Sequence, residues 1–152
     1  MANWKEKFRA IMAVYVILEN KDGEVLLLLR ENTGYCDGQY GLPAGHVDGN
    51  EELLSAMRRE ALEEVGVRIG PEHLELVHTM HRYCGDHERI DFFFKCTNWE
   101  GEPINAEPHK CGGIQWFDLR DLPEELIDYY RHMFECIERG ENYSSFGWTV
   151  VH

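Results

Sequence analysis

The stretch from Gly45 to Val67 constrains the fold of this chain most, because a glycine loop there leads into a helix with closely spaced glutamates. In a helix, Glu60, Glu63 and Glu64 stand at positions i, i+3 and i+4, so all three side chains project from one edge. Like charges in this arrangement destabilise an isolated helix. Carboxylate oxygens are also the ligands that Mg²⁺ and Mn²⁺ prefer. The stretch therefore predicts a divalent cation site beside a glycine loop.

The same helix is expected to start at Asn50 as its N-cap and to end near Val65, with Gly66 placed to terminate it. Glu51 and Glu52 would then lie in the first turn, where the helix dipole favours negative charge. The buried face is expected to consist of apolar residues at helical spacing, namely Leu53, Leu54, Met57, Ala61 and Val65. The glutamate edge lies beside that face, so the cation site should sit at the rim of the core.

Strands are expected on both sides of this helix. The continuous apolar run 11–18 predicts a strand buried on both faces. The Asp-Gly turn that follows favours a hairpin with residues 24–30. The remaining expectations are short strands or extended segments at 40–47, 74–83, 90–97 and 114–118, a second helix at 122–138 with Pro123 near its first turn, a loose arm or edge strand at 1–9, and an unassigned aromatic tail at 143–148. This order predicts an α/β domain with a mixed sheet and helices on its faces.

Length, charge and cysteine content limit the classes of function. The chain has 152 residues, which fits one domain over 1–152. A net charge of -13 argues against binding a nucleic-acid polymer, but it allows a small anionic ligand if metal ions offset the charge. The five cysteines are odd in number and form no Cys-x-x-Cys pair, so we expect a reducing compartment, the cytoplasm, and no disulfide framework. The apolar run 11–18 is too short to span a membrane.

The spacing of residues from Gly45 to Val67 carries a resemblance to a known family. The pattern G-x5-E-x7-R-E-U-x-E-E-x-G-U, with U an apolar residue, is met from Gly45 to Val67 without a gap. This pattern is the Nudix box, and the chain resembles MutT-like members of the Nudix hydrolase family, in motif style the nucleoside triphosphate diphosphatases. The likeness extends over about residues 10–137, including the lead-in Gly41–His46 and the loop 107–111. It implies the Nudix α/β/α sandwich, and hydrolysis of a nucleoside diphosphate linked to another group X.

The family resemblance also suggests roles for the site residues. Glu60 and Glu64 lie one helical turn apart and can share a cation, while Glu63 can hold a second ion or act through water. The resemblance implies Mg²⁺ as cofactor, with Mn²⁺ as a substitute, and it adds Glu107 and the carbonyl of Ala44 or Gly45 as further oxygen ligands. The general base is expected to be Glu60, with Glu107 as the second choice. Arg59 is expected to orient these carboxylates through Glu63 or Glu51.

Substrate contacts are less constrained by the motif. Arg30, at the end of a predicted strand, either clamps a phosphate or is an ordinary surface arginine. Tyr83 and Tyr129 either stack on a base or belong to the core.

The function expected from these features is hydrolysis of a nucleoside triphosphate, modified or not, to a monophosphate and pyrophosphate. Hydrolysis of ADP-ribose or another nucleotide sugar is the alternative within the same chemistry. A non-catalytic nucleotide-binding module is the alternative of another class, and the complete set of box glutamates argues against it. The expected partner is a small-molecule nucleotide, with no nucleic-acid polymer, no membrane and a possible homodimer.

Overall fold

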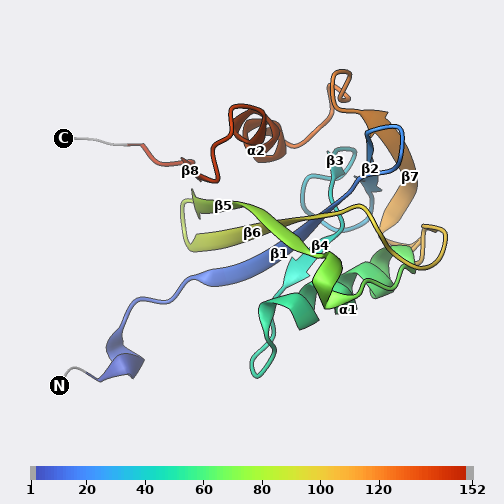
Figure 1. Cartoon of the computed structure of the whole chain (residues 1–152). Coiled ribbons are helices and arrows are strands. Elements are labelled where there is room, and N and C mark those ends of the chain that lie inside the picture. The colour runs from blue at the N-terminus through green and yellow to red at the C-terminus, as the bar shows by residue number, and fades with distance from the viewer. Residues whose placement is uncertain (1–2, 150–152) are drawn as a thin grey trace.

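The computed structural model describes residues 3–149 and places two β-sheets between two α-helices (Figure 1). The larger sheet is mixed, with strand order β4-β1-β6-β5-β8, and the smaller sheet has the order β3-β2-β7. The elements are β1 (Ile11–Leu18), β2 (Glu24–Arg30), β3 (Tyr40–Gly41), β4 (Ala44–His46), α1 (Leu53–Val65), β5 (Glu75–Tyr83), β6 (Glu88–Cys96), β7 (Cys111–Asp118), α2 (Asp128–Glu138) and β8 (Tyr143–Phe146), with 3₁₀ turns η1 (Trp4–Glu6) and η2 (Pro71–His73). The predicted α/β/α fold with a mixed sheet is confirmed.

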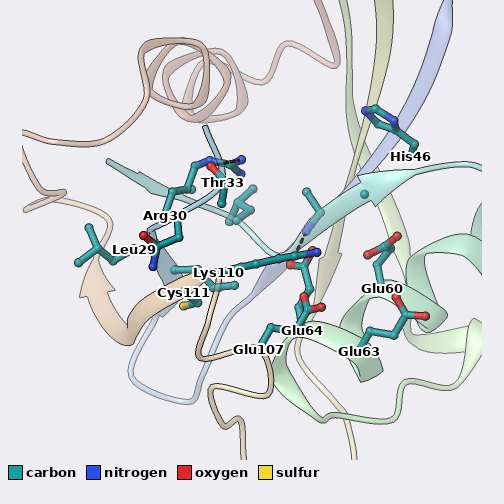
Figure 2. Close-up of a pocket in the computed structure, with 16 residues that line it drawn as sticks. Leu29, Arg30, Thr33, His46, Glu60, Glu63, Glu64, Glu107, Lys110 and Cys111 are labelled. Atoms are coloured by element: carbon teal, nitrogen blue, oxygen red, sulfur yellow. Dashed lines mark hydrogen bonds between the residues drawn. The ribbon is translucent and has the colours of Figure 1, made fainter. Parts of the chain in front are cut away.

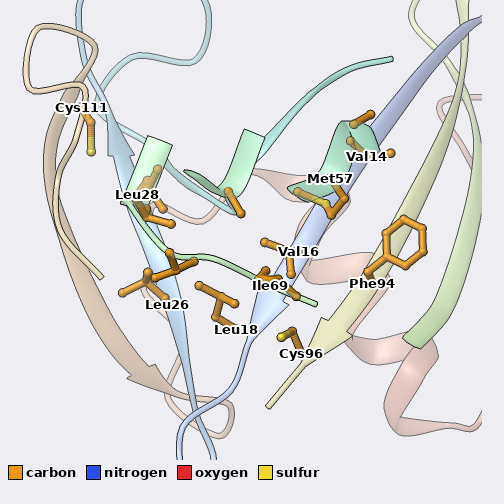
Figure 3. Close-up of a cluster of buried hydrophobic side chains, with 14 residues drawn as sticks. Val14, Val16, Leu18, Leu26, Leu28, Met57, Ile69, Phe94, Cys96 and Cys111 are labelled. Atoms are coloured by element: carbon orange, nitrogen blue, oxygen red, sulfur yellow. The ribbon is translucent and has the colours of Figure 1, made fainter. Parts of the chain in front are cut away.

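Strand β1 lies between β4 and β6 in the larger sheet and is buried on both faces. It pairs antiparallel with β4 and parallel with β6. Because side chains alternate along a strand, its two faces join two separate hydrophobic clusters. Val14, Val16 and Leu18 belong to the cluster under α1, which Figure 3 shows. Ala13, Tyr15 and Ile17 belong to the cluster under α2. The continuous apolar run in the sequence reflects this burial between two helices.

The predicted hairpin between residues 11–18 and 24–30 is wrong, although both strands form. The turn closes, with the Gly23 N–H donating to the Asn20 carbonyl at 3.1 Å. Strand β2 nevertheless pairs with β3 and β7 in the smaller sheet. Both edges of β2 are therefore occupied, and both edges of β1 are occupied by β4 and β6. The chain changes sheets at this turn, and a single bridge between Glu19 and Val25 joins the two strands.

Helix α1 begins two residues later than predicted. Its N-cap is Glu52, whose Oε2 accepts hydrogen bonds from the backbone N–H groups of Leu54 at 3.0 Å and Ser55 at 3.3 Å. Asn50 instead has φ 64° in the preceding turn, so the predicted Asn50 cap is wrong. The predicted end is confirmed, because Gly66 adopts φ 70°, a left-handed conformation that glycine reaches without steric cost.

The buried face of α1 is shifted from the prediction. The buried residues of the helix are Ala56, Met57, Ala61 and Val65. Leu53 and Leu54 are only partly buried, and they pack against the edge of the same cluster.

The C-terminal part of the chain differs most from the expected boundaries. Helix α2 starts at Asp128 and not at 122, because the segment before it is held in an extended pairing with Tyr40. The Tyr40 N–H donates to the Glu125 carbonyl at 3.0 Å, and the Ile127 N–H donates to the Tyr40 carbonyl at 3.1 Å. Pro123 therefore precedes the helix.

One further strand boundary departs from the expectations, and two segments that the sequence left open take a defined form. Strand β7 begins at residue 111, before the expected 114. The tail forms β8, parallel to β5. Residues 4–6 form a 3₁₀ turn and not an edge strand. In the described range 3–149, neither α-helix is long and apolar enough to cross a membrane.

Candidate active site

A pocket of about 580 Å³ lies where the C-terminal half of α1 meets the glycine loop, the end of β2 and the loop before β7. Its lining includes the three box glutamates Glu60, Glu63 and Glu64, together with Glu107. Figure 2 shows these four carboxylates on one side of the pocket and Arg30 on the opposite side. The structure thus brings together the carboxylates that the sequence singled out, with Glu107 arriving from a distant part of the chain.

Gly45 allows the loop to lie directly against the helix. It pairs with Val14 of β1, so its position is fixed by the larger sheet. A Cβ atom at this position would overlap the carboxyl group of Glu60. Any residue other than glycine would therefore push Glu60 out of its present position.

Glu64 is the carboxylate most strongly affected by its surroundings. Its Oε2 accepts a hydrogen bond from the Ala44 N–H at 3.1 Å, which favours the ionised form. Loss of hydration acts more strongly in the other direction, and together with the charges of Glu60 and Glu107 it raises the pKa of Glu64 to about 8. Burial also raises the pKa of Glu60. Burial therefore works against the ionised form at both Glu60 and Glu64.

Glu107 reaches the site because its loop is attached to the end of α1. The last carbonyls of an α-helix have no partner within the helix. Here the Val65 carbonyl accepts from Ile104 N–H at 3.0 Å, and the Glu64 carbonyl accepts from Ala106 N–H at 3.1 Å. The next residue along the loop is Glu107, so its side chain lies beside Glu64 (Figure 2).

Arg59 holds the carboxylates around the helix edge. Its Nε and Nη2 donate to the two carboxylate oxygens of Glu51 at 2.7 and 3.0 Å. Its Nη1 donates to Glu60 at 2.8 Å and to Glu63 at 3.3 Å, and its Nη2 donates to the His46 carbonyl at 3.2 Å. These bonds raise the pKa of Arg59 above its ordinary value. Both expected partners, Glu63 and Glu51, are engaged at once.

The donor set fits a hard divalent cation by its chemistry. Four carboxylates face the same pocket, and a bound cation would favour the ionised form of Glu64, whose pKa is raised. Within residues 3–149, no three carboxylate, imidazole or thiol groups are arranged as ligands of one metal ion. Glu60 and Glu63 are instead turned toward Arg59. Oxygen-only donors of this kind suit Mg²⁺ or Mn²⁺.

The opposite side of the pocket supplies positive charge. Arg30 lines it, with Nε donating to the Tyr35 carbonyl at 2.8 Å and Nη2 donating to Thr33 Oγ1 at 3.2 Å. Lys110 also lines the pocket, and Figure 2 shows its side chain extending toward the glutamates. In the described part of the chain, no carboxylate oxygen lies within 4.0 Å of its ammonium group. The sequence reasoning assigned Lys110 no role, although it lies three residues after Glu107 in the same loop.

Tyr83 and Tyr129 do not line this pocket. They line a separate cavity of about 470 Å³ together with Tyr35 and Arg82. Tyr129 is 6% exposed, and the guanidinium of Arg82 lies 3.8 Å from its ring centroid. Tyr83 is exposed and packs against Trp148 at 5.1 Å between ring centroids. Tyr35 borders the second cavity and also contacts Arg30 of the first.

Comparison with known proteins places this fold and site in a family. The NUDIX domain model matches residues 10–138. The chain is 30% identical over 109 residues to the oxidized purine nucleoside triphosphate hydrolase of Danio rerio, covering 71% of this chain and 67% of that protein. It is 29% identical over 147 residues to the RNA pyrophosphohydrolase of Bartonella henselae, covering 80% of this chain and 84% of that protein. The crystal structure of a MutT NUDIX hydrolase from Burkholderia pseudomallei superposes with a TM-score of 0.75 at 26% identity, covering 84% of this chain and 97% of that one.

The chain therefore belongs to the NUDIX domain family, as a MutT-like Nudix pyrophosphohydrolase. The resemblance inferred from the spacing of the box is confirmed. The box glutamates described above lie within the matched range 10–138.

Proposed function

We propose that this enzyme hydrolyses a nucleoside triphosphate, preferably one with an oxidised purine base, to a nucleoside monophosphate and pyrophosphate. The observation that carries the proposal is the pairing of four glutamates with Arg30 and Lys110 across one pocket. Such a pocket accepts a polyphosphate only when cations neutralise the acidic side. The similarity to the Danio rerio oxidized purine nucleoside triphosphate hydrolase supports the choice of substrate class.

Glu60, Glu63, Glu64 and Glu107 are the residues proposed to hold Mg²⁺ or Mn²⁺, with a carbonyl of Ala44 or Gly45 as an additional ligand. When bound, the cation neutralises phosphate oxygens and lowers the pKa of a water molecule. The chain itself supplies the orientation of these ligands. Arg59 fixes Glu60 from one side, and the attachment of loop 104–106 to α1 fixes the approach of Glu107.

Glu60 is the proposed general base. Burial raises the pKa of Glu60, which makes this carboxylate a better proton acceptor near neutral pH than a fully hydrated glutamate. Its hydrogen bond from Arg59 at 2.8 Å holds one oxygen and leaves the other available. Glu107 is the second candidate, because it faces the same pocket from the loop before β7.

Arg30 and Lys110 are the proposed phosphate contacts on the cationic side. Tyr83 and Tyr129 remain proposed base contacts, and their shared cavity supports this role because Tyr35 connects it to Arg30. A substrate that spans both cavities would place its phosphates at the glutamates and its base at the tyrosines.

The 5′-triphosphate end of an RNA is a second candidate substrate. The similarity to the Bartonella henselae RNA pyrophosphohydrolase favours it, whereas the net charge of -13 argues against a long nucleic-acid ligand. The homodimer and the cytoplasmic location stay predictions.

A substrate panel tests the proposal. Purified enzyme with Mg²⁺ is given 8-oxo-dGTP, dGTP, ADP-ribose and 5′-triphosphorylated RNA, and the phosphorus-containing products are quantified. The proposal expects the highest kcat/KM for 8-oxo-dGTP, with pyrophosphate as product. A higher kcat/KM for the RNA or for ADP-ribose would replace the proposed substrate.

A further inference from the structure

A third cavity, of about 600 Å³ and here called the outer cavity, lies on the outer side of α1 and takes no part in the proposed reaction. It is enclosed by α1, by the segment 68–73 and by the segment 98–100. Arg59 is its nearest link with the active site, because this residue borders the cavity and also binds Glu60 and Glu63.

The walls of this outer cavity are joined by backbone hydrogen bonds. The Arg68 N–H donates to the Glu100 carbonyl at 3.0 Å, and the Glu100 N–H donates to the Arg68 carbonyl at 2.8 Å. Arg58 of α1 donates from Nε to the Ile69 carbonyl at 2.6 Å, which ties the helix to the same wall. Ile69 is buried in the cluster under α1. The cavity is therefore built from ordered elements of the fold.

Two of the arginines that border this cavity form no ion pair within residues 3–149, although the chain is strongly acidic. Three arginines, Arg58, Arg59 and Arg68, face two glutamates, Glu72 and Glu100, in a chain of net charge -13. Arg59 is neutralised by its own carboxylate partners. Among residues 3–149, neither Arg58 nor Arg68 has a carboxylate oxygen within 4.0 Å. Within that range, the guanidinium groups of Arg58 and Arg68 thus have no anionic partner.

The remaining walls supply further donors and an aromatic surface. Asn98 Nδ2 lies 3.4 Å from His73 Nε2, so an amide and an imidazole meet at the rim. Trp99 is partly buried and stacks on Trp116, with ring centroids 6.1 Å apart. A planar guanidinium matches the oxygens of a phosphate, and an amide donor complements that recognition.

We propose that the outer cavity binds a phosphate-type oxyanion through Arg58 and Arg68. Free pyrophosphate and the phosphate group of a nucleotide present the same oxygens and are the two possible sources. The proposal does not depend on which substrate the active site hydrolyses.

The test is a titration of the full chain with inorganic pyrophosphate in the absence of divalent cations, followed by amide chemical shifts in NMR spectra. We expect saturable shifts at residues 68–73 and 98–100, separate from any shifts around the glycine loop. The double variant Arg58→Gln/Arg68→Gln should bind at least about tenfold more weakly, which corresponds to about 1.4 kcal/mol. Arg120→Gln is the control, because Arg120 is exposed and paired with Asp118 outside the cavity.

A parallel titration with AMP distinguishes the two sources. If only pyrophosphate shifts these amides, the ligand of the cavity is the free anion. If both pyrophosphate and AMP shift them, the cavity also accepts the phosphate group of a nucleotide. Either outcome supports the site. If the double variant does not fold, the single variant Arg68→Gln replaces it in the titration. Among the described residues the Arg68 side chain makes no hydrogen bond, so its loss should not disturb the fold. The proposal is overturned if pyrophosphate shifts only the amides near Gly45, or if the variants bind it as tightly as the unmodified chain.

Discussion

The backbone N–H of Ala44 donates a hydrogen bond to Oε2 of Glu64 at 3.1 Å. This bond joins the glycine loop to the last turns of α1, and it holds Glu64 where hydration is poor. The neighbouring charges of Glu60 and Glu107 add to the effect. Relative to a fully hydrated glutamate, these effects favour the neutral form of Glu64 over its ionised form.

Stability of the metal-free protein should fall as pH rises between about 4.5 and 8. The pKa of Glu64 is about 8 in the folded chain, against an ordinary value of 4.5. The folded state therefore retains a proton that the unfolded state has already lost, so raising the pH through this window favours unfolding. Thermal melts in EDTA from pH 5 to pH 9 measure the effect.

Glu64→Gln is the matched variant for those melts. Glutamine does not ionise, so the loss of stability from pH 5 to pH 8 should be smaller in this variant than in the unmodified chain. Equal slopes for the two proteins would show that Glu64 does not hold a proton in the folded state.

Gly45→Ala should remove most activity while leaving the fold in place. The added Cβ would overlap the carboxyl group of Glu60, so the proposed base must move. We expect kcat to fall by more than about tenfold, by analogy with the effect of small displacements at reacting groups. Gly49→Ala is the control, because a Cβ there meets no atom within 4 Å. Similar kcat values for the two variants would contradict the close approach of the loop to Glu60.

Arg59→Lys tests whether Arg59 acts by orienting the neighbouring carboxylates or only by its positive charge. Lysine keeps the positive charge but cannot hold Glu51 through two parallel bonds while also reaching Glu60 and Glu63. Loss of an orienting partner typically costs about 10–100-fold, and we expect it in kcat with little change in KM. Arg120→Lys is the control, because Arg120 is exposed and paired with Asp118 away from the pocket. A change confined to KM would instead indicate that Arg59 contacts the substrate.

Lys110→Gln should weaken substrate binding more than turnover. Within the described residues its ammonium has no carboxylate oxygen within 4.0 Å, and Figure 2 shows the side chain extending toward the glutamates. We expect KM to rise by about tenfold and kcat to change less, because the contact is made to phosphate oxygens in both ground and transition states. Lys110→Arg should restore part of the affinity. An unchanged KM in steady-state kinetics would exclude this contact.

Local patterns in the sequence were sufficient to place the three box glutamates of the site. The i, i+3 and i+4 spacing placed Glu60, Glu63 and Glu64 on one edge of a helix, and the structure has them there. The end of α1 at Gly66 follows from the same local rule, since glycine adopts the left-handed conformation that closes a helix. These features depend on residues close together in the chain.

The features that were missed depend on contacts between distant segments. The Asp-Gly turn predicts a hairpin, but the assignment of β2 to the smaller sheet is decided by its pairing with β7, about ninety residues away. The late start of α2 is decided by the pairing of residues 125–127 with Tyr40. Lys110 enters the pocket because its loop is attached to α1 through Ile104 and Ala106. No local propensity encodes these attachments.

A Mg²⁺ titration of pyrophosphate release tests the central claim most directly. The unmodified chain and Glu64→Gln are compared with 8-oxo-dGTP as substrate, and circular dichroism confirms that both are folded. We predict no pyrophosphate release in EDTA and saturable release with Mg²⁺. In Glu64→Gln the rate of release should fall by more than about 100-fold, because loss of a metal ligand costs more than loss of a residue that only supports a ligand. Release that is independent of Mg²⁺, or equal in the folded variant, would contradict a metal-dependent reaction at the glutamate cluster.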